Sequence, residues 1–388
     1  MSWRTRGELA ALAAKAVGGA AAGLLVSAVP GEGFVPIAPE ARAALRKRSA
    51  AVLAAAGVRA GQRALVSLNS EGDLGGALLA DALVEVGASA AVVGPRGRMR
   101  TLAAVRALRP EVWVTTPTGA LDFLARLYLE FNVDPIELEL GHILLVGEIP
   151  SPGTSRRLAA EFEAELTGLY CDPIVGGVWA HARGGKWQVA EPSVLARAAL
   201  GEDALLEAGA TGPGELVLRP DWAGPLAGLT LRTGEVVAAA PAEGVGASGA
   251  PDGGSLFQHT VGDHLLVRGR WLSLPLLRRA LAGIDGIAGF VVVAERGEGT
   301  LDKLTIRLAF QRPSLVENPM WAARAREAIA AITPVEFAVE TVLAEEDTPR
   351  ETIDDRRGHH LGADRRLAAR GPVDAGRAGS PDGSRHGG

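Results

Sequence analysis

The first part of the chain alternates amphipathic stretches with short apolar runs. Over residues 39–56 the apolar positions share one helical face and the basic run 46–48 lies outside it, which predicts a helix. The run 141–146 (GHILLV) is almost wholly apolar, as in a strand covered on both faces. Similar patterns predict strands at 62–68, 89–93 (buried) and 111–115, and helices at 74–86, 99–108, 121–129 and 156–165. This alternation predicts right-handed βαβ units and a parallel sheet, an α/β fold.

The pattern changes after about residue 184. Short apolar runs separated by Gly and Pro predict antiparallel strands at 215–218, 229–232 and 236–239. Residues 242–254 are rich in Gly, Ala and Pro, which is typical of a flexible loop. Beyond it the pattern predicts a strand, a helix, two strands, a helix and a strand, the order of a small ferredoxin-like α+β domain: 264–268, 274–282, 290–294, 303–309, 321–332 and 334–342.

Composition narrows the classes of function. The chain has 388 residues, enough for two domains, and its net charge of −5 gives no basic surface for nucleic acid. The single cysteine, Cys171, excludes an intramolecular disulfide and favours a reducing, cytoplasmic setting. A signal peptide after Arg4 and Arg6 is disfavoured because Glu8 and Lys15 interrupt it, and no stretch reaches the roughly 20 apolar residues of a membrane span. Residues 358–388 contain almost nothing apolar, which predicts a disordered tail.

Several short motifs occur in a fixed order along the chain. Gly147-Glu148 follows the apolar run, and Tyr170 lies about twenty residues further on. The later motifs are 214–218 (GELVL), 232–235 (RTGE), Asp263 with 266–269 (LVRG) and Pro275, and finally Pro349-Arg350 with 354–357 (DDRR). Together they resemble the phenylacetate-CoA ligase branch of the adenylate-forming enzymes over about residues 5–357.

The resemblance implies a large domain at 1–258, a small mobile C-terminal domain at 259–357, and two-step chemistry. A carboxylate attacks the α-phosphorus of ATP to give an acyl-adenylate and pyrophosphate, and the thiol of CoA then displaces AMP. The implied cofactors are ATP or AMP with magnesium and CoA, and the implied partner is an acyl or aryl acid or an acyl-CoA.

The resemblance also assigns site residues, each of which has a plainer interpretation as a turn or core residue. The nucleotide-binding candidates are Gly147, Glu148, Tyr170, Asp172, Glu235 and Asp263. The candidates for the CoA or acyl pocket are Gly75, Gly76, Thr116, Arg268 and Gly269.

Other positions depart from the family pattern. The stretch aligned with the phosphate-binding loop, 27–34 (SAVPGEGF), has no Thr or Lys and carries Glu32, which would repel phosphate. The stretch 152–157 (PGTSRR) looks suited to phosphate, but a helix cap at Thr154 or Ser155 explains it better.

Three further departures concern metal-binding and cationic positions. Ile174 stands where the family has a magnesium-associated glutamate, and Thr260 stands where it has a phosphate-binding arginine. No lysine follows Lys303, so the C-terminal catalytic lysine of the family has no counterpart. We therefore assign no catalytic or metal-binding residue.

These departures predict a phenylacetate-CoA ligase-like protein that has lost ATP-dependent adenylation. It would act by binding an acyl, aryl or nucleotide ligand or a partner enzyme. Three alternatives stay open: an active AMP-forming aryl- or acyl-CoA ligase with a rebuilt site, a protein that transfers an acyl group from a supplied thioester or adenylate, and a structural partner in a homodimer.

Overall fold

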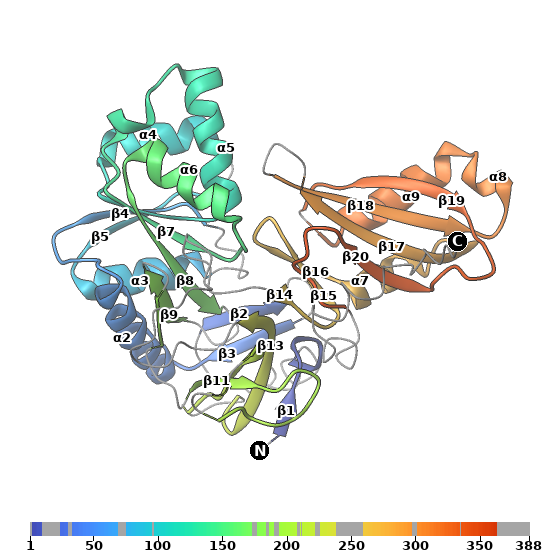
Figure 1. Cartoon of the computed structure of the whole chain (residues 1–388), viewed down its shortest axis with the longest axis horizontal. Helices are drawn as coiled ribbons and strands as arrows, with labels where there is room; N and C mark the ends of the chain where they lie inside the picture. Colours follow the sequence, from blue (N-terminus) through green and yellow to red (C-terminus); the bar gives the residue numbers. More distant parts are fainter. Residues whose placement is uncertain are drawn as a thin grey trace, which may run out of the picture.

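A seven-stranded sheet forms the centre of the first part of the molecule (Figure 1). The computed structural model describes residues 2–9, 24–29, 33–68, 75–94, 97–172, 177–183, 186–189, 194–207, 210, 212–221, 226–237, 259–296, 301–333 and 335–362. The sheet order is β10-β9-β8-β7-β6-β4-β5. Its strands are β4 (Arg63–Val66), β5 (Ser89–Val92), β6 (Val112–Thr115), β7 (His142–Val146), β8 (Glu165–Asp172), β9 (Gly177–Arg183) and β10 (Lys186–Val189).

The predicted parallel sheet is confirmed by β5, β4, β6 and β7, which pair in parallel in this order. β8 also pairs in parallel with β7, but no strand was predicted there. β9 and β10 continue the sheet in antiparallel pairs and were not predicted. β7 is buried along its whole length, as its apolar run predicts. The strand predicted at 89–93 is confirmed as β5, but its predicted burial was wrong, because among the described strands β5 pairs with β4 alone and forms a half-exposed edge.

Helices cover both faces of this sheet. They are α2 (Pro39–Ala55), α3 (Gly76–Val86), α4 (Arg98–Leu108), α5 (Pro117–Arg126), η1 (Leu127–Phe131), η2 (Pro135–Leu138) and α6 (Pro152–Phe162). Alternate residues of one strand face opposite sides, so Leu144 joins a core with α2 and α3 while Leu145 joins another with α5 and α6. Ser151 caps α6 through its Oγ, which accepts from the Thr154 amide, so a cap explains this motif but not at Thr154 or Ser155.

A second, mainly antiparallel sheet contains β1 (Ser2–Arg4), β11 (Leu195–Ala198), β12 (Gly214–Leu218), β13 (Leu229–Val237) and β14 (His259–Thr260). β13 is one continuous strand where two were predicted, and it pairs with β1, β12 and β14. β2 (Leu24–Val29) and β3 (Gly33–Ile37) form a separate antiparallel pair over the stretch aligned with the phosphate loop. Residues 30–32 and the expected loop 242–254 lie outside the described residues.

The C-terminal part has its own four-stranded sheet, ordered β19-β18-β17-β20. The expected strand near 264–268 is β15 and lies outside this sheet, because it pairs with β16 in a hairpin. The sheet is completed instead by β20, which pairs in parallel with β17 and was not predicted. The elements are β15 (His264–Val267), β16 (Arg270–Ser273), α7 (Leu274–Leu281), β17 (Ile287–Arg296), β18 (Asp302–Phe310), α8 (Pro313–Val316), α9 (Pro319–Ala330), β19 (Ala338–Leu343) and β20 (Glu351–Asp355).

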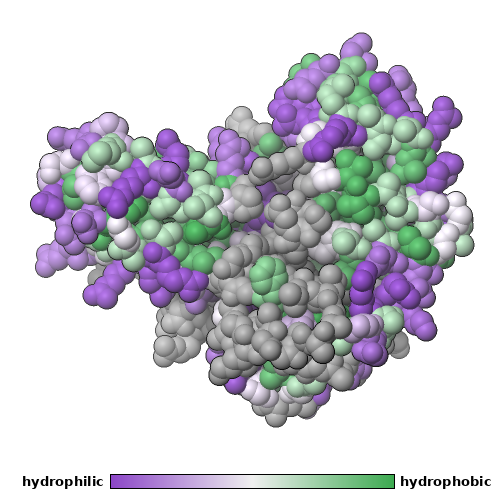
Figure 2. Space-filling view, turned by 180° about the vertical axis from the view of Figure 1, so that it is seen from behind, coloured by the Kyte–Doolittle hydropathy of each residue, from purple (hydrophilic) through white to green (hydrophobic). Residues whose placement is uncertain are grey.

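Hydrophilic and hydrophobic residues are mixed over the surface of both parts on the face shown in Figure 2. Among the described residues, no helix has the length and apolarity needed to span a bilayer. The division into domains at residue 258 stays a prediction.

Residues 358–362, expected to belong to a disordered tail, instead run beside β14. The Thr260 amide donates to His359 O (2.6 Å), the Leu361 amide to Thr260 O (2.9 Å) and the Gly262 amide to Gly362 O (3.2 Å). Burial lowers the pKa of His360 to about 4, so its ring is neutral at pH 7 and accepts or donates one hydrogen bond with Thr260 Oγ1 (2.8 Å). Residues 358–362 therefore connect the C-terminal part to β14 of the second sheet, just before Asp263 in the sequence.

Ending the chain after Arg357 should expose this edge of β14. Loss of these backbone hydrogen bonds should speed hydrogen exchange at Thr260 and Gly262 and lower the unfolding free energy by about 1–3 kcal/mol. Native-state exchange and urea unfolding measure both effects. A chain ending after Gly362 is the matched control, and equal exchange in the two truncated proteins would contradict the assignment.

Candidate functional site

Three of the residues predicted to bind nucleotide surround the guanidinium of Arg6. Arg6 Nη2 donates to Asp172 Oδ2 (2.8 Å) and lies 3.7 Å from Glu235 Oε2, while Nε donates to Thr233 O (2.5 Å). The Tyr170 hydroxyl donates to the same Asp172 oxygen (3.3 Å). Arg6 is 4% exposed, so a protein side chain fills the centre of this group.

Strand geometry explains why these side chains converge. Tyr170 and Asp172 are two residues apart at the end of β8 and therefore share a face. Glu235 lies on β13 directly after Gly234, whose φ of 78° is a backbone conformation that residues with a side chain rarely adopt. A Cβ at Gly234 would lie 3.1 Å from the carbonyl oxygen of Val261. The motif RTGE thus keeps a glycine for steric reasons.

Residues 2–9, here called the N-terminal segment, take part in a pair of cation–π contacts. The Arg6 guanidinium carbon lies 4.8 Å from the ring centre of Trp271 on β16. The Arg232 guanidinium carbon lies 4.8 Å from the ring centre of Trp3 on β1. Leu9 is fully buried in the adjoining core. The segment therefore links β13 to the hairpin of β15 and β16.

The cluster holds one cation and two carboxyl groups. Burial raises the pKa of Glu235 to about 8; Arg6 opposes this rise and the nearby Asp172 adds to it. Burial alone would lower the pKa of Arg6, but Asp172 and Glu235 hold it above its usual value. Because Asp172 takes the shorter contact with Arg6, Glu235 is the group that gains most from being protonated.

A second buried carboxyl group lies at the predicted Gly147-Glu148 turn. Gly147 has a φ of 76°, and Glu148 Oε2 accepts from the amide (2.9 Å) and the hydroxyl (2.6 Å) of Thr118. Burial raises the pKa of Glu148 to about 7, against the hydrogen bonds from Thr118, and Asp302 adds to the rise. This turn therefore holds a carboxyl group that is half protonated near neutral pH.

The C-terminal sheet meets this turn through a charged cluster. Asp302 is 3% exposed and accepts from Arg296 Nε (2.8 Å) and Arg357 Nη1 (2.5 Å). Arg296 Nη2 also donates to the carbonyl of Ile149 (3.2 Å), and Arg357 Nη2 donates to Leu266 O (3.0 Å). The terminal DDRR motif thus forms structural ion pairs.

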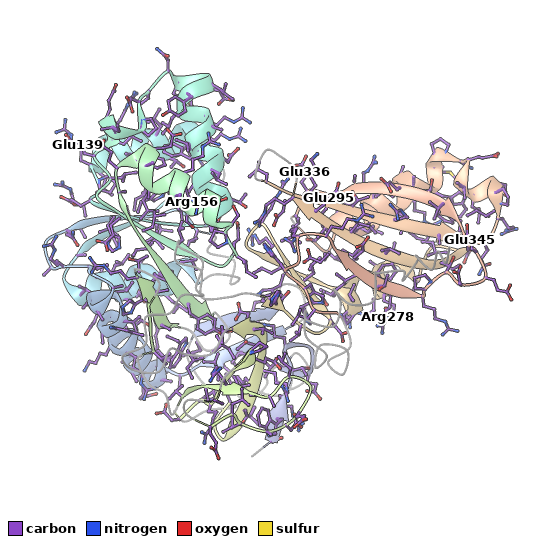
Figure 3. The ribbon with its side chains drawn as sticks, viewed as in Figure 1. Glu139, Arg156, Arg278, Glu295, Glu336 and Glu345 are labelled. Atoms are coloured by element: carbon purple, nitrogen blue, oxygen red, sulfur yellow. The ribbon has the colours of Figure 1, made fainter. Side chains whose placement is uncertain are left out.

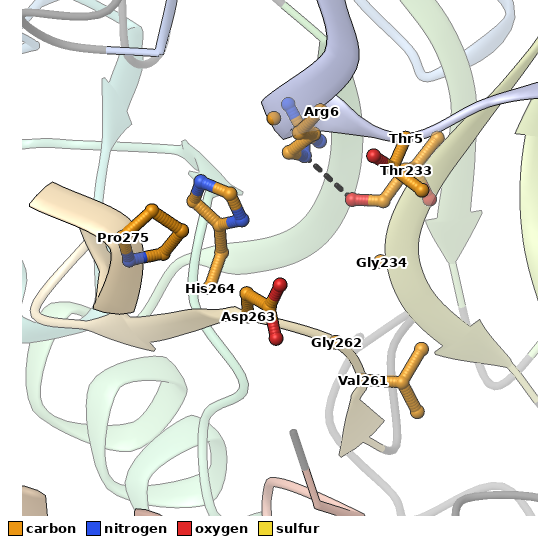
Figure 4. A pocket seen from close by; sticks show the side chains of 10 residues that line it. Thr5, Arg6, Thr233, Gly234, Val261, Gly262, Asp263, His264 and Pro275 are labelled. Carbon is orange, nitrogen blue, oxygen red and sulfur yellow. Dashed lines mark hydrogen bonds between the residues drawn. The ribbon is translucent and has the colours of Figure 1, made fainter. Parts of the chain in front are cut away.

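A cavity of about 380 Å³ lies beside the Arg6 cluster. Figure 4 shows Asp263 and His264 on one side of it and Arg6 with Thr233 on the other. Asp263 is exposed, whereas His264 is buried. The cavity therefore gives solvent a route towards the otherwise closed cluster.

The predicted CoA and acyl residues occupy turns and helix starts. Gly75 precedes α3 with a φ of 61° and Gly76 begins that helix, while Thr116 caps α5 by accepting from the Gly119 amide (2.9 Å). Arg268 and Gly269 form the turn between β15 and β16, with φ values of 49° and 69°. Arg268 donates to Asp302 O (2.7 Å) and contacts Glu336 (3.2 Å), which Figure 3 labels.

The nucleotide candidates are brought together only in part. Tyr170, Asp172 and Glu235 share the Arg6 cluster, and Asp263 lines the cavity next to it. Sequence reasoning missed Arg6, which stood out only as a basic residue before an apolar stretch.

Ile174 lies outside the described residues, and among those described no three His, Cys, Asp or Glu side chains are grouped closely enough to hold a metal ion. Burial also raises the pKa of the Cys171 thiol well above its usual value, which argues against a reactive thiolate.

The fold is that of the adenylate-forming enzymes. The 2-hydroxyisobutyryl-CoA ligase in complex with 2-HIB-AMP and CoA in the thioesterification state aligns with a TM-score of 0.69 and 15% identity, over 86% of this chain and 74% of that one. Amide bond synthetase McbA from Marinactinospora thermotolerans aligns with a TM-score of 0.59 and 15% identity, over 84% of this chain and 66% of that one. Malonyl-CoA ligase with methylmalonyl-CoA and AMP bound aligns with a TM-score of 0.55 and 14% identity, over 84% of this chain and 71% of that one. No protein-family model and no curated protein matches the sequence.

Replacing Glu235 by Gln should flatten the pH dependence of stability. The folded-state pKa of Glu235, about 8, lies above its ordinary value of 4.5, so the folded protein holds an extra proton between these values. The stability from this proton is fully present below about pH 4.5 and is lost as the pH rises towards 8, by about 1.4 kcal/mol per pH unit at most. Urea unfolding from about pH 5 to about pH 8 measures the slope. Glu40→Gln, on an exposed position of α2, is the control, and an unchanged slope in Glu235→Gln would refute the assignment.

Proposed function

We propose that this chain is a phenylacetate-CoA ligase-like protein that does not adenylate carboxylic acids. It binds an acyl or aryl ligand, or a partner enzyme, on the adenylate-forming fold. The contact that carries this proposal is the ion pair of Arg6 with Asp172 (2.8 Å), beside Glu235. The carboxyl groups that the resemblance assigns to the nucleotide are thereby turned towards a protein cation.

Electrostatics and sterics both support the proposal. A ribose would need to displace the Arg6 guanidinium, which is buried and bonded to two groups, before its hydroxyls could reach Glu235. Displacement would leave Asp172 buried without its cation, which typically costs several kcal/mol. The side chains present therefore do not fit ATP in the manner of the family.

The missing cations give independent support. Adenylation concentrates negative charge at the α-phosphorus and needs cations there. The chain has no lysine after Lys303, and Thr260 holds the place of the phosphate-binding arginine. Thr260 Oγ1 is instead within 2.8 Å of His360 Nδ1.

Transfer of an acyl group from a supplied thioester or adenylate is the second candidate. It draws support from the alignment with a CoA-bound ligase in its thioesterification state, which spans 86% of this chain and thus includes much of the C-terminal part. Residues 358–362 and Arg296 also join the C-terminal part to the rest of the chain. A C-terminal part held in one orientation would suit a protein that carries out the thioester-forming step without the adenylation step.

The purified protein should show no ATP–pyrophosphate exchange with a panel of aliphatic and aromatic acids. ATP with magnesium, and AMP, should leave the unfolding midpoint unchanged, whereas a ligand at a hundredfold excess over its dissociation constant adds about 2.7 kcal/mol to stability. An active acyl-CoA ligase is the positive control for exchange.

Acid-dependent exchange with magnesium would overturn the proposal and favour an active ligase. A midpoint shift with CoA or an acyl-CoA but not with ATP would favour acyl transfer. Parallel titrations with each ligand alone separate these outcomes.

A further inference from the structure

The groups around Arg6 match the geometry of a guanidinium. Its edge donates to a carbonyl through Nε and to a carboxylate through Nη2, and its face lies 4.8 Å from the ring centre of Trp271. A planar fork with an aromatic face below it suits a guanidinium far better than a compact ammonium. Asp172 and Thr233 are 1% and 2% exposed, so water competes poorly for these acceptors.

The Arg6 side chain does not form every hydrogen bond that the surrounding acceptors offer. Among the described residues, Arg6 Nη1 and Glu235 Oε2 are buried and lack a hydrogen-bond partner. The closest approach between Arg6 and Glu235 is 3.7 Å, too long for a hydrogen bond. A free guanidinium could rotate and shift to donate to both carboxylates, a freedom that the backbone of the N-terminal segment denies to Arg6.

The neighbouring cavity supplies access. It is about 380 Å³ in volume, and it is lined by Arg6 and Thr233 on one side and by the exposed Asp263 on another (Figure 4). Asp263 adds negative charge at the route by which a cation would enter. A small cation can therefore reach the cluster without disturbing β8 or β13.

We propose that Asp172, Thr233, Glu235 and Trp271 form a guanidinium-binding site, which the N-terminal segment fills with Arg6 as an internal ligand. A small free guanidinium compound takes this site when the Arg6 side chain is removed. The inference goes beyond the proposed function, because it specifies what the closed site recognises whether or not the protein adenylates an acid.

Arg6→Ala with ethylguanidinium tests the site. Ethylguanidinium carries the heavy atoms that alanine lacks relative to arginine, and butylammonium has the same charge without the planar fork. Calorimetry and thermal unfolding at constant ionic strength should show that Arg6→Ala binds ethylguanidinium at least about tenfold more tightly than butylammonium. The wild-type protein should bind neither, because Arg6 already fills the site.

Two variants sharpen the test. Arg4→Ala lies in the same segment and removes a guanidinium whose hydrogen bond, within the described part of the chain, goes to the carbonyl of its neighbour Trp3, so it should create no binding. Adding Glu235→Gln to Arg6→Ala should weaken ethylguanidinium binding by about tenfold, since it removes a carboxyl group that can ionise beside the bound cation. Equal affinity for both cations in folded Arg6→Ala, or no binding, would overturn the proposal.

A measurement on the wild-type protein covers the case in which Arg6→Ala does not fold. The Nε–H proton of Arg6 should exchange with solvent at least about a hundredfold more slowly than that of Arg4 in NMR spectra, because it is buried against Thr233 O. Equal exchange at the two arginines would refute the internal ligand. ATP binding by the wild-type protein would overturn the proposed function and leave this result unaffected.

Discussion

The burial of one guanidinium between two carboxyl groups constrains the arrangement of the whole site. Moving such charges out of water is costly, and it is offset only where partners are held in good geometry. Arg6 meets Asp172 on β8, Glu235 on β13 and Trp271 on β16, three elements distant in sequence. The N-terminal segment, both sheets and the C-terminal hairpin must therefore hold their relative positions for this cation to remain solvated by protein groups.

A second buried cluster, around Asp302, also fixes the position of the C-terminal part relative to the first sheet. Asp302 takes two arginines, and one of these, Arg296, reaches the carbonyl of Ile149 beside the buried carboxyl group of Glu148. Residues 358–362 add backbone hydrogen bonds to β14. Asp263 thus lies between two sets of contacts that join the C-terminal part to the rest of the chain.

Local periodicity predicted α2, α3, α4 and the parallel strands β4 to β7, because their patterns depend on neighbours within a few residues. It failed for β20, whose charged sequence ETIDD becomes a strand only through pairing with β17. The resemblance assigned Tyr170, Asp172 and Glu235 to the same ligand, and these three side chains do surround Arg6. Arg6 could not be predicted with them, because its partner Asp172 lies 166 residues away and a lone arginine carries no periodic signal.

The pairing of β1 with β13 has a consequence for synthesis of the chain. Ser2 pairs with Leu229, so β1 must wait for a strand that is made more than two hundred residues later. At roughly 5–20 residues per second, the delay is on the order of 10–45 s. Throughout that time Trp3 lacks the Arg232 guanidinium and Arg6 lacks the carbonyl of Thr233, so the packing around both side chains must form late in synthesis.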